Sequence, residues 1–201
     1  MKILAFTDVH GYDKALRSLK AKSKRSRPDL VLCAGDFTVF EHNMENILRK
    51  INSLGKTVFL VHGNHESESK VRRLCRKFRN ISFIHKRIVS FGGVLFLGWG
   101  GGGFSFSDKS FEDFVRKNKA KINAAEKVVF MTHAPPYGTS LDFLEYSKAH
   151  VGNKSFTRFI KSHKNVVLAI SGHLHENEGK KDKLNSAVLS NPGLFGRIFK
   201  V

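Results

Sequence analysis

The amino-acid sequence predicts an α/β fold in which two β-sheets face each other and helices cover the outside. Short apolar runs of strand length alternate along the chain with segments whose apolar residues recur at helical spacing. There are about ten such runs in only 201 residues, which favours two facing sheets over one.

Five segments carry their apolar residues on one side at a spacing of three or four positions, so each predicts an amphipathic helix. Ser67, Ser110 and Asn153 precede the last three as expected N-caps. The residues that share a face are Tyr12, Ala15, Leu16 and Leu19; Met44, Ile47, Leu48 and Ile51; Val71, Leu74, Cys75 and Phe78; Phe111, Phe114 and Val115; and Phe156, Phe159 and Ile160.

The apolar runs between these segments are three to six residues long and predict strands. In chain order they are 2–6, 30–34, 57–61, 81–84, 88–91, 94–97, 127–131, 166–170, 187–189 and 194–199.

Length and composition predict one domain over residues 1–201, with 41% hydrophobic and 26% charged residues. No apolar run approaches the ~18 residues of a membrane helix, and no signal-peptide pattern opens the chain, so we expect a cytoplasmic protein without membrane insertion. Cys33 and Cys75 fall in apolar patterns and are interpreted as buried thiols. The sequence gives no indication of the oligomeric state.

The formal net charge is +18, which attracts polyanions such as nucleic acid or phosphorylated ligands. Basic residues gather in 22–27 and in 70–77, where they fit either a nucleic-acid path or a solvated helix face. A proteome rich in lysine would give the same charge, so charge alone does not choose a partner.

Polar residues follow five of the apolar runs directly. Ligands of α/β sheets bind in the crevice beyond the carboxyl ends of the strands, so these residues are expected to meet there. The five segments are 7–10, 35–36, 62–66, 132–133 and 171–175.

The side chains that this crevice would collect are typical metal ligands. In Asp8-Val9-His10 and His173-Leu174-His175 the two-residue spacing lets both members of a pair face one way. Carboxylates with imidazoles suit Mn, Fe, Co, Ni or Zn rather than calcium. Asp36 can bridge two ions through its two oxygens. The collected residues are Asp8, His10, Asp36, Asn64, His65, His133, His173 and His175, whereas His42, His85 and His163 are expected to be packed or solvated.

The order Asp-x-His, Gly-Asp, Gly-Asn-His-Glu, a lone His after a strand, and Gly-His-x-His resembles the calcineurin-like metallophosphoesterase family. The resemblance spans residues 8 to 175, and every signature position is filled. It implies a four-layer αββα sandwich with the metals at one edge.

The resemblance also implies the role of each residue. Asp36 would bridge two divalent ions, and manganese is the expected ion. Asp8, His10, Asp36 and His175 would hold the first ion, and Asp36, Asn64, His133 and His173 the second. His65 and Asn64 would be the catalytic residues, and His65 would not bind metal. Glu66 would orient a neighbouring residue, and His62 has no assigned role.

Family resemblance further implies hydrolysis of phosphoesters. Two such ions, ~3.5–4 Å apart, would activate a bridging water for attack on phosphorus, and His65 would protonate the leaving oxygen. We expect a phosphodiesterase or phosphatase; the alternative is a nuclease acting on DNA or RNA. A third hypothesis, a non-catalytic protein-binding scaffold, is disfavoured because such relatives have lost metal ligands and this chain has not.

Overall fold

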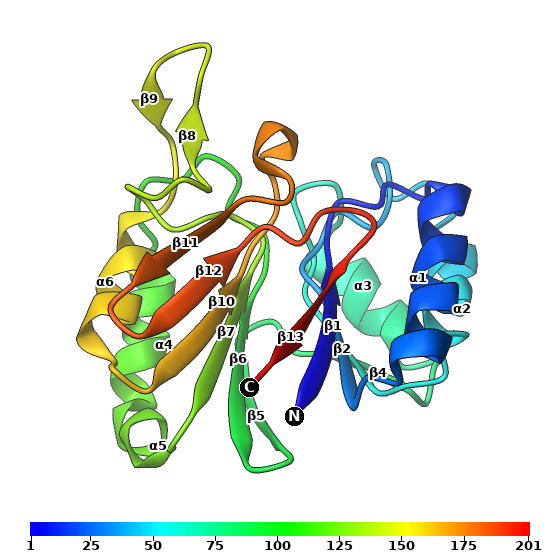
Figure 1. The fold of residues 1–201 in the computed structure, drawn as a ribbon, viewed down its shortest axis with the longest axis horizontal. Helices are drawn as coiled ribbons and strands as arrows, with labels where there is room; N and C mark the ends of the chain where they lie inside the picture. Colours follow the sequence, from blue (N-terminus) through cyan, green and yellow to red (C-terminus); the bar gives the residue numbers. More distant parts are fainter.

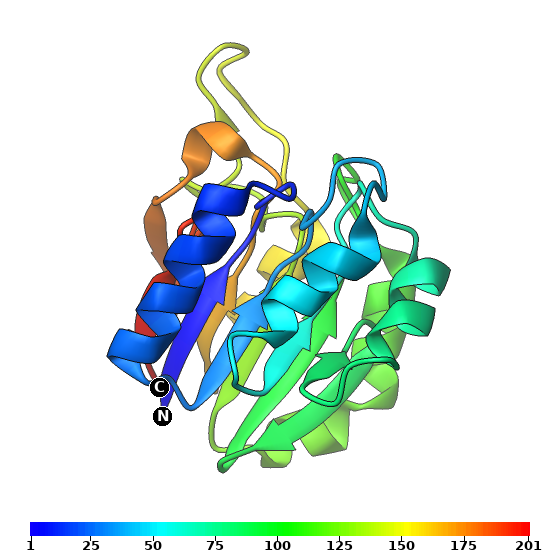
Figure 2. The same cartoon turned by 90° about the vertical axis from the view of Figure 1, so that its right-hand side faces the viewer.

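The computed structural model describes residues 1–201 and has the two facing sheets between helices that the sequence predicts (Figure 1). One sheet has five strands in the order β13-β1-β2-β3-β4, and the other has six in the order β11-β12-β10-β7-β6-β5. Both sheets mix parallel and antiparallel pairs. Each sheet has helices on its outer face (Figures 1 and 2).

The five-stranded sheet contains four parallel strands, β1 to β4, that end level with one another. Phe6, Cys33 and Leu60 lie side by side at the ends of β1, β2 and β3. The polar residues that follow these strands therefore reach the same edge. The strands are β1 (Lys2–Phe6), β2 (Leu30–Cys33), β3 (Val58–Leu60), β4 (Ile81–Phe83) and the antiparallel edge strand β13 (Arg197–Lys200).

The six-stranded sheet repeats this arrangement on the other side of the molecule. Met131 of β7 lies beside Ile170 of β10, so these two parallel strands also end together. Antiparallel strands close both edges of the sheet. The strands are β5 (Arg87–Phe91), β6 (Val94–Trp99), β7 (Val128–Thr132), β10 (Val166–Ile170), β11 (Lys181–Leu184) and β12 (Ala187–Ser190).

One group of helices packs on the first sheet and a second group packs on the other (Figures 1 and 2). The first group is α1 (Asp13–Ser26), α2 (Met44–Asn52) and α3 (Glu68–Cys75). The second is α4 (Lys109–Lys117), α5 (Lys119–Ala124) and α6 (Lys154–Ser162). None of the helices combines the length and apolar character needed to cross a membrane.

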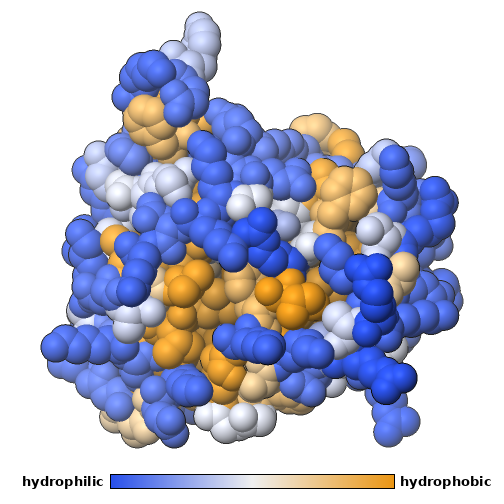
Figure 3. Space-filling model, in the orientation of Figure 1, coloured by the Kyte–Doolittle hydropathy of each residue, from blue (hydrophilic) through white to orange (hydrophobic).

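Alternation along the strands divides the core into three layers. In β1, Ile3 and Ala5 point between the sheets, while Leu4 and Phe6 pack against the helices. A strand buried on both faces reads as a continuous apolar run, which is why these strands were predictable. In the orientation of Figure 1, apolar residues reach the surface along the middle of the molecule, between polar flanks (Figure 3).

The structure corrects several element boundaries. Ser110 is not an N-cap: α4 begins at Lys109, and Asp108, two residues before Ser110, caps it by accepting a hydrogen bond from the Phe111 N–H. The strand predicted over 194–199 is shorter because Gly196, at φ +67°, precedes β13. The helix α5, the edge strand β11 and the short hairpin of β8 (Phe143–Leu144) and β9 (Ala149–His150) were not predicted. Their sequences are too short or too polar to show periodicity.

Candidate metal centre

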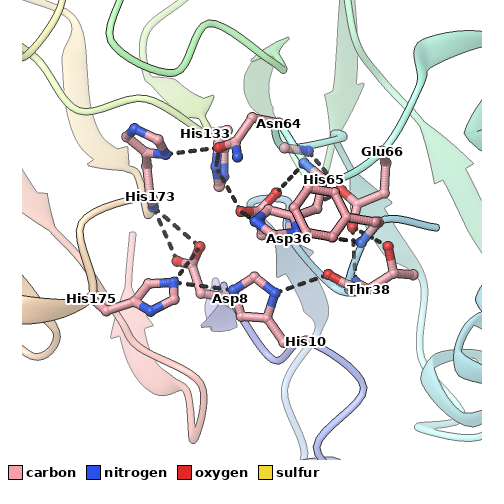
Figure 4. Close-up of polar contacts among 12 residues, drawn as sticks. Asp8, His10, Asp36, Thr38, Asn64, His65, Glu66, His133, His173 and His175 are labelled. Atoms are coloured by element: carbon pink, nitrogen blue, oxygen red, sulfur yellow. Dashed lines mark hydrogen bonds and ion pairs between the residues drawn. The ribbon is translucent and has the colours of Figure 1, made fainter. Parts of the chain in front are cut away.

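The five strand-end segments meet at one edge of the two sheets (Figure 4). Asp8 follows β1, Asp36 follows β2 and Asn64 follows β3, while His133 and His173 follow β7 and β10 of the other sheet. Because the strands of each sheet end level, a few loop residues suffice to bring these side chains together. The structure thus collects the residues that the sequence predicted.

One cluster of ligand atoms comes from Asp8, His10 and His175, which lie within 4.8 Å of one another. His10 Nε2 and His175 Nε2 are 3.1 Å apart, and His175 Nε2 is 3.7 Å from Asp8 Oδ1. His10 Nδ1 lies 2.9 Å from the Thr38 carbonyl oxygen, to which it donates. The His10 proton is therefore on Nδ1, and Nε2 presents its lone pair to the cluster.

Asp36, Asn64, His133 and His173 form the adjoining half of the centre. His133 Nε2 lies 2.9 Å from Asn64 Oδ1 and 3.4 Å from Asp36 Oδ2. His173 Nδ1 approaches the same Asn64 oxygen at 2.8 Å. His133 Nδ1 donates to the Ala34 carbonyl at 2.9 Å, so the backbone of a neighbouring loop orients this ring.

His65 lies beside Asp36 and His10. Its Nε2 is 3.8 Å from Asp36 Oδ2, and it shares a possible ligand cluster with Asp36 and His10. The Phe40 N–H donates to His65 Nδ1 at 3.3 Å, and the two rings are 4.4 Å apart. The neutral imidazole therefore carries its proton on Nε2, the atom that faces the centre. This geometry is compatible with either a proton donor or a ligand.

Four of the collected residues have backbone angles that residues other than glycine rarely adopt. Asp8, His10, Asp36 and His173 have φ of 53°, 44°, 47° and 71°. The left-handed region costs such residues roughly 1–2 kcal/mol each, although Asp and His tolerate it better than most. Strain of this kind gathers at functional sites, where the surrounding structure holds it in place.

Two glycines leave room for the carboxylates. A Cβ on Gly63 would lie 2.0 Å from Asp36 Oδ1, and one on Gly172 would lie 2.3 Å from Asp8 Oδ2. Asp36 and Asp8 therefore pack directly against main chain of the loops after β3 and β10. Any larger residue at either glycine would displace a carboxylate from the centre.

Glu66 is buried behind the centre and orients the loops that form it. One carboxylate oxygen accepts hydrogen bonds from the N–H groups of Asp36 and Gly63, and the other accepts two from Thr38. Burial raises the pKa of Glu66 to about 7, against the opposing effect of these hydrogen bonds. The role expected for Glu66, orienting a neighbour, agrees with these contacts.

Without metal, Asp36 and His133 form an ion pair within the centre, and His173 is uncharged. Burial would raise the pKa of Asp36, but the hydrogen bond and charge of His133 outweigh it and hold the pKa at about 2. Burial would likewise lower the pKa of His133, which Asp36 instead raises to about 9. For His173, burial and the nearby charge of His133 lower the pKa to about 4, so this ring is neutral.

The donor set fits divalent cations. Buried carboxylates and imidazole nitrogens converge without any Lys or Arg between them, and the three ligand clusters overlap: Asp8, His10 and Asp36 each belong to two. His173 Nε2 is buried and has no hydrogen-bond partner, which leaves a polar atom to be satisfied. Overlapping clusters of this kind suit two ions that share ligands.

Sequence reasoning missed three residues that line the centre. Thr38 fixes the His10 ring through its carbonyl, Phe40 stacks on His65, and Phe104 stacks on His173 with the rings 4.6 Å apart. Phe40 and Phe104 are 76% and 60% exposed. No pattern marked the first two, but Phe104 directly follows the glycine-rich run that starts at Gly98 and so was findable.

The remaining histidines lie outside the ligand clusters. His62 and His85 pack against each other, and His85 accepts a hydrogen bond from the Gly100 N–H. His163 packs on Phe159 at the end of α6, with the rings 4.5 Å apart. His42 lines a pocket next to His10 without belonging to a ligand cluster.

Several known proteins resemble this chain in sequence or in fold. An uncharacterized protein of Methanocaldococcus jannaschii is 29% identical over 201 residues, which covers 96% of this chain and 88% of that relative. Among solved structures, a protein of Thermus thermophilus has a TM-score of 0.76 at 16% identity, over 96% of this chain and 90% of that one. A dimetal phosphatase from Danio rerio has a TM-score of 0.69 at 12% identity, over 97% and 88% of the two chains.

At such identities the two solved structures show the fold alone. The sequence model of the family described as "Calcineurin-like phosphoesterase" matches residues 1–177, which include all five strand-end segments. The chain therefore belongs to the calcineurin-like phosphoesterase family.

Proposed function

We propose that this protein hydrolyses phosphoester bonds with the help of two divalent metal ions. The observation that carries the proposal is the meeting of two buried carboxylates, four ligand histidines and Asn64 at the ends of five strands. Family membership supplies the reaction class, a metal-dependent phosphoester cleavage.

In this proposal Asp8, His10 and His175 hold the first ion, and Asn64, His133 and His173 hold the second, with Asp36 shared. Manganese is the ion that we expect; iron, cobalt, nickel and zinc suit the same donors. Bound ions of this kind polarise phosphoryl oxygens and lower the pKa of bound water to near neutrality. The carbonyls of Thr38 and Ala34 orient His10 and His133 toward the ions.

His65 is the proposed proton donor. Its Nε2 faces the centre, and its Nδ1 lies 3.3 Å from the Phe40 nitrogen. With a phosphoester at the centre, the imidazolium form of His65 would transfer its Nε2 proton to the oxygen of the departing alcohol and become neutral. Asp36 Oδ2 lies 3.8 Å from His65 Nε2.

The proposed substrate is a phosphodiester or a phosphomonoester. A nuclease is the second candidate, and the net charge of +18 is the observation that favours it. The scaffold alternative has little support, because every ligand of the family signature is present.

The test uses the complete protein with manganese and two chromogenic substrates, bis-p-nitrophenyl phosphate and p-nitrophenyl phosphate. We expect hydrolysis of at least one, loss of it in EDTA and recovery when manganese is restored. The variant His163→Ala, which changes a histidine outside the ligand clusters, is the control and should keep wild-type activity. Bound metal without turnover of either substrate would contradict the proposal and favour the scaffold.

A further inference from the structure

Exposed aromatic side chains lie beside the metal centre and next to one another. The Phe104 ring stacks edge-on against His173 at 4.6 Å and is 60% exposed. Two residues on, Phe106 is 53% exposed and lies 6.1 Å from the ring of Tyr137. Exposed phenylalanines are costly in water, and their gathering beside a candidate active site indicates a ligand.

Hydrogen bonds hold this loop in place although its rings face solvent. The Lys154 N–H donates to the Phe106 carbonyl at 2.7 Å, and Asn153 Nδ2 donates to the Ser105 carbonyl at 2.9 Å. Asn153 also caps α6 by accepting from Ser155 N–H at 2.9 Å. The aromatic rings are therefore presented by a fixed loop that is anchored to the start of a helix.

The ammonium group of Lys154 lies close to two of these rings. Lys154 Nζ lies 4.8 Å from the centre of the Tyr137 ring and 5.5 Å from that of Phe106. Lys154 is exposed, so its ammonium group can contact a phosphate while its stem covers the rings. Stacking rings with an interleaved cation are the usual means of holding single-stranded nucleic acid.

A second exposed ring lies on the other side of the centre. Phe40 is 76% exposed, stacks on His65 and has φ of 43°. The next residue, Glu41, accepts hydrogen bonds from Ser67 and pairs with Lys70 at 2.9 Å, which ties the loop to the start of α3. A phosphodiester carries a nucleoside on each side of its phosphate, and the centre has an exposed ring on each side.

We propose that Phe104, Phe106, Tyr137 and Lys154, here called the aromatic track, bind the bases and phosphates of single-stranded nucleic acid next to the scissile phosphate. This inference rests on the proposed function, since it places the strand by its phosphate at the metal centre. Bases of a duplex are stacked inside the helix and do not reach such rings. A small ester without an aromatic group would leave them in contact with water.

The test measures the contribution of the bases to binding, by fluorescence anisotropy with labelled oligothymidylate and with an abasic strand of the same length and charge. The binding measurements are made in EDTA, which prevents cleavage, and are then repeated with manganese. Wild type should bind oligothymidylate roughly 5- to 150-fold more tightly per stacked base than the abasic strand. Phe106→Leu and Phe104→Leu should lose much of this preference, and Phe106→Trp should retain it because it keeps a stacking surface.

The control variant is Tyr146→Ala, which removes a fully exposed ring at the hairpin tip outside the track and should bind as wild type does. Equal affinity of wild type for the two strands would overturn the inference, as would an equal loss in the Tyr146 variant. A preference confined to thymidine mononucleotides would also overturn it and indicate a single-base subsite. Hydrolysis of bis-p-nitrophenyl phosphate by wild type tests the proposed function separately, so the two failures are distinguishable.

Discussion

His10 illustrates how individual residues are constrained in this centre. Its ring is oriented by the Thr38 carbonyl, and its backbone has φ of 44°, in the left-handed region. The same region holds Asp8, Asp36 and His173, which the fold must keep there against an intrinsic preference for other angles. Side-chain chemistry and backbone geometry are thus required at the same positions.

We predict that His10→Gly is more stable than His10→Ala. Both variants lose the imidazole, but only glycine adopts a positive φ without cost, so the difference should be about 1 kcal/mol. Urea denaturation in EDTA, with no metal to mask the effect, measures both free energies of unfolding. Equal stability, or a more stable alanine variant, would show that the backbone at His10 is not strained.

His65→Ala should retain bound metal and lose activity by ~10²–10⁴-fold, the usual effect of removing a general acid. The loss should be greatest on alkyl phosphoesters, whose leaving groups need a proton, and smaller on p-nitrophenyl esters, which leave as anions. Measurements of kcat/KM for both substrates, together with metal content, separate the roles. Loss of one metal with an equal drop on both substrates would make His65 a ligand, as its cluster with His10 and Asp36 permits.

The meeting of the site residues was predictable because polar residues follow the apolar strands at Asp8, Asp36 and His133. The contact of Phe40 with His65 and that of Phe104 with His173 were not predictable. They depend on how distant loops fold back over the strand ends. A sequence records which side chains follow a strand, but not which exposed rings approach them.

At the scale of elements, α4 shows how a helix start is decided by tertiary contacts. Asp108 Oδ1 accepts from Phe111 N–H at 2.9 Å, and Oδ2 accepts from the Trp99 indole N–H at 2.8 Å. Ser110 has the composition of an N-cap but lies inside the first turn. The second hydrogen bond, which comes from β6, is invisible to a local pattern.

We expect Asp108→Ala to destabilise the protein by about 2 kcal/mol, since it removes a cap and leaves the Trp99 N–H without its partner. Ser110→Ala is the matched control and should change stability by less than about 0.5 kcal/mol. Thermal or urea unfolding, followed by the fluorescence of Trp99, gives both values. A larger effect at Ser110 would reverse the assignment of the cap.

Strands were predictable where both faces are buried and not where the edge is polar. β2 reads Leu30-Val31-Leu32-Cys33 and is buried throughout. β11 reads Lys181-Asp182-Lys183-Leu184 and is half exposed, so its only signal is pairing with β12. Edge strands often carry charge, which discourages further pairing and also hides them from hydrophobic patterns.

Over the whole molecule, the two sheets act together. The first sheet supplies Asp8, Asp36 and Asn64, and the second supplies His133 and His173, so neither sheet alone holds a complete centre. The packing between the sheets, around residues such as Phe96 and Ile170, therefore determines the distances within the site. Two sheets were predictable from the number of strands, whereas their relative position depends on side-chain packing across this layer.

Metal stoichiometry is the measurement that tests the dinuclear centre most directly. The protein is loaded with manganese, freed of excess metal by gel filtration and analysed by mass spectrometry of the element. Wild type should hold two ions per chain, and so should Asp113→Ala, which removes an exposed carboxylate of α4. Asp36→Ala should lose occupancy at both positions, because it removes the ligand that the two ions share. One ion or fewer in wild type, or two ions held tightly by Asp36→Ala, would contradict a dinuclear centre bridged by Asp36.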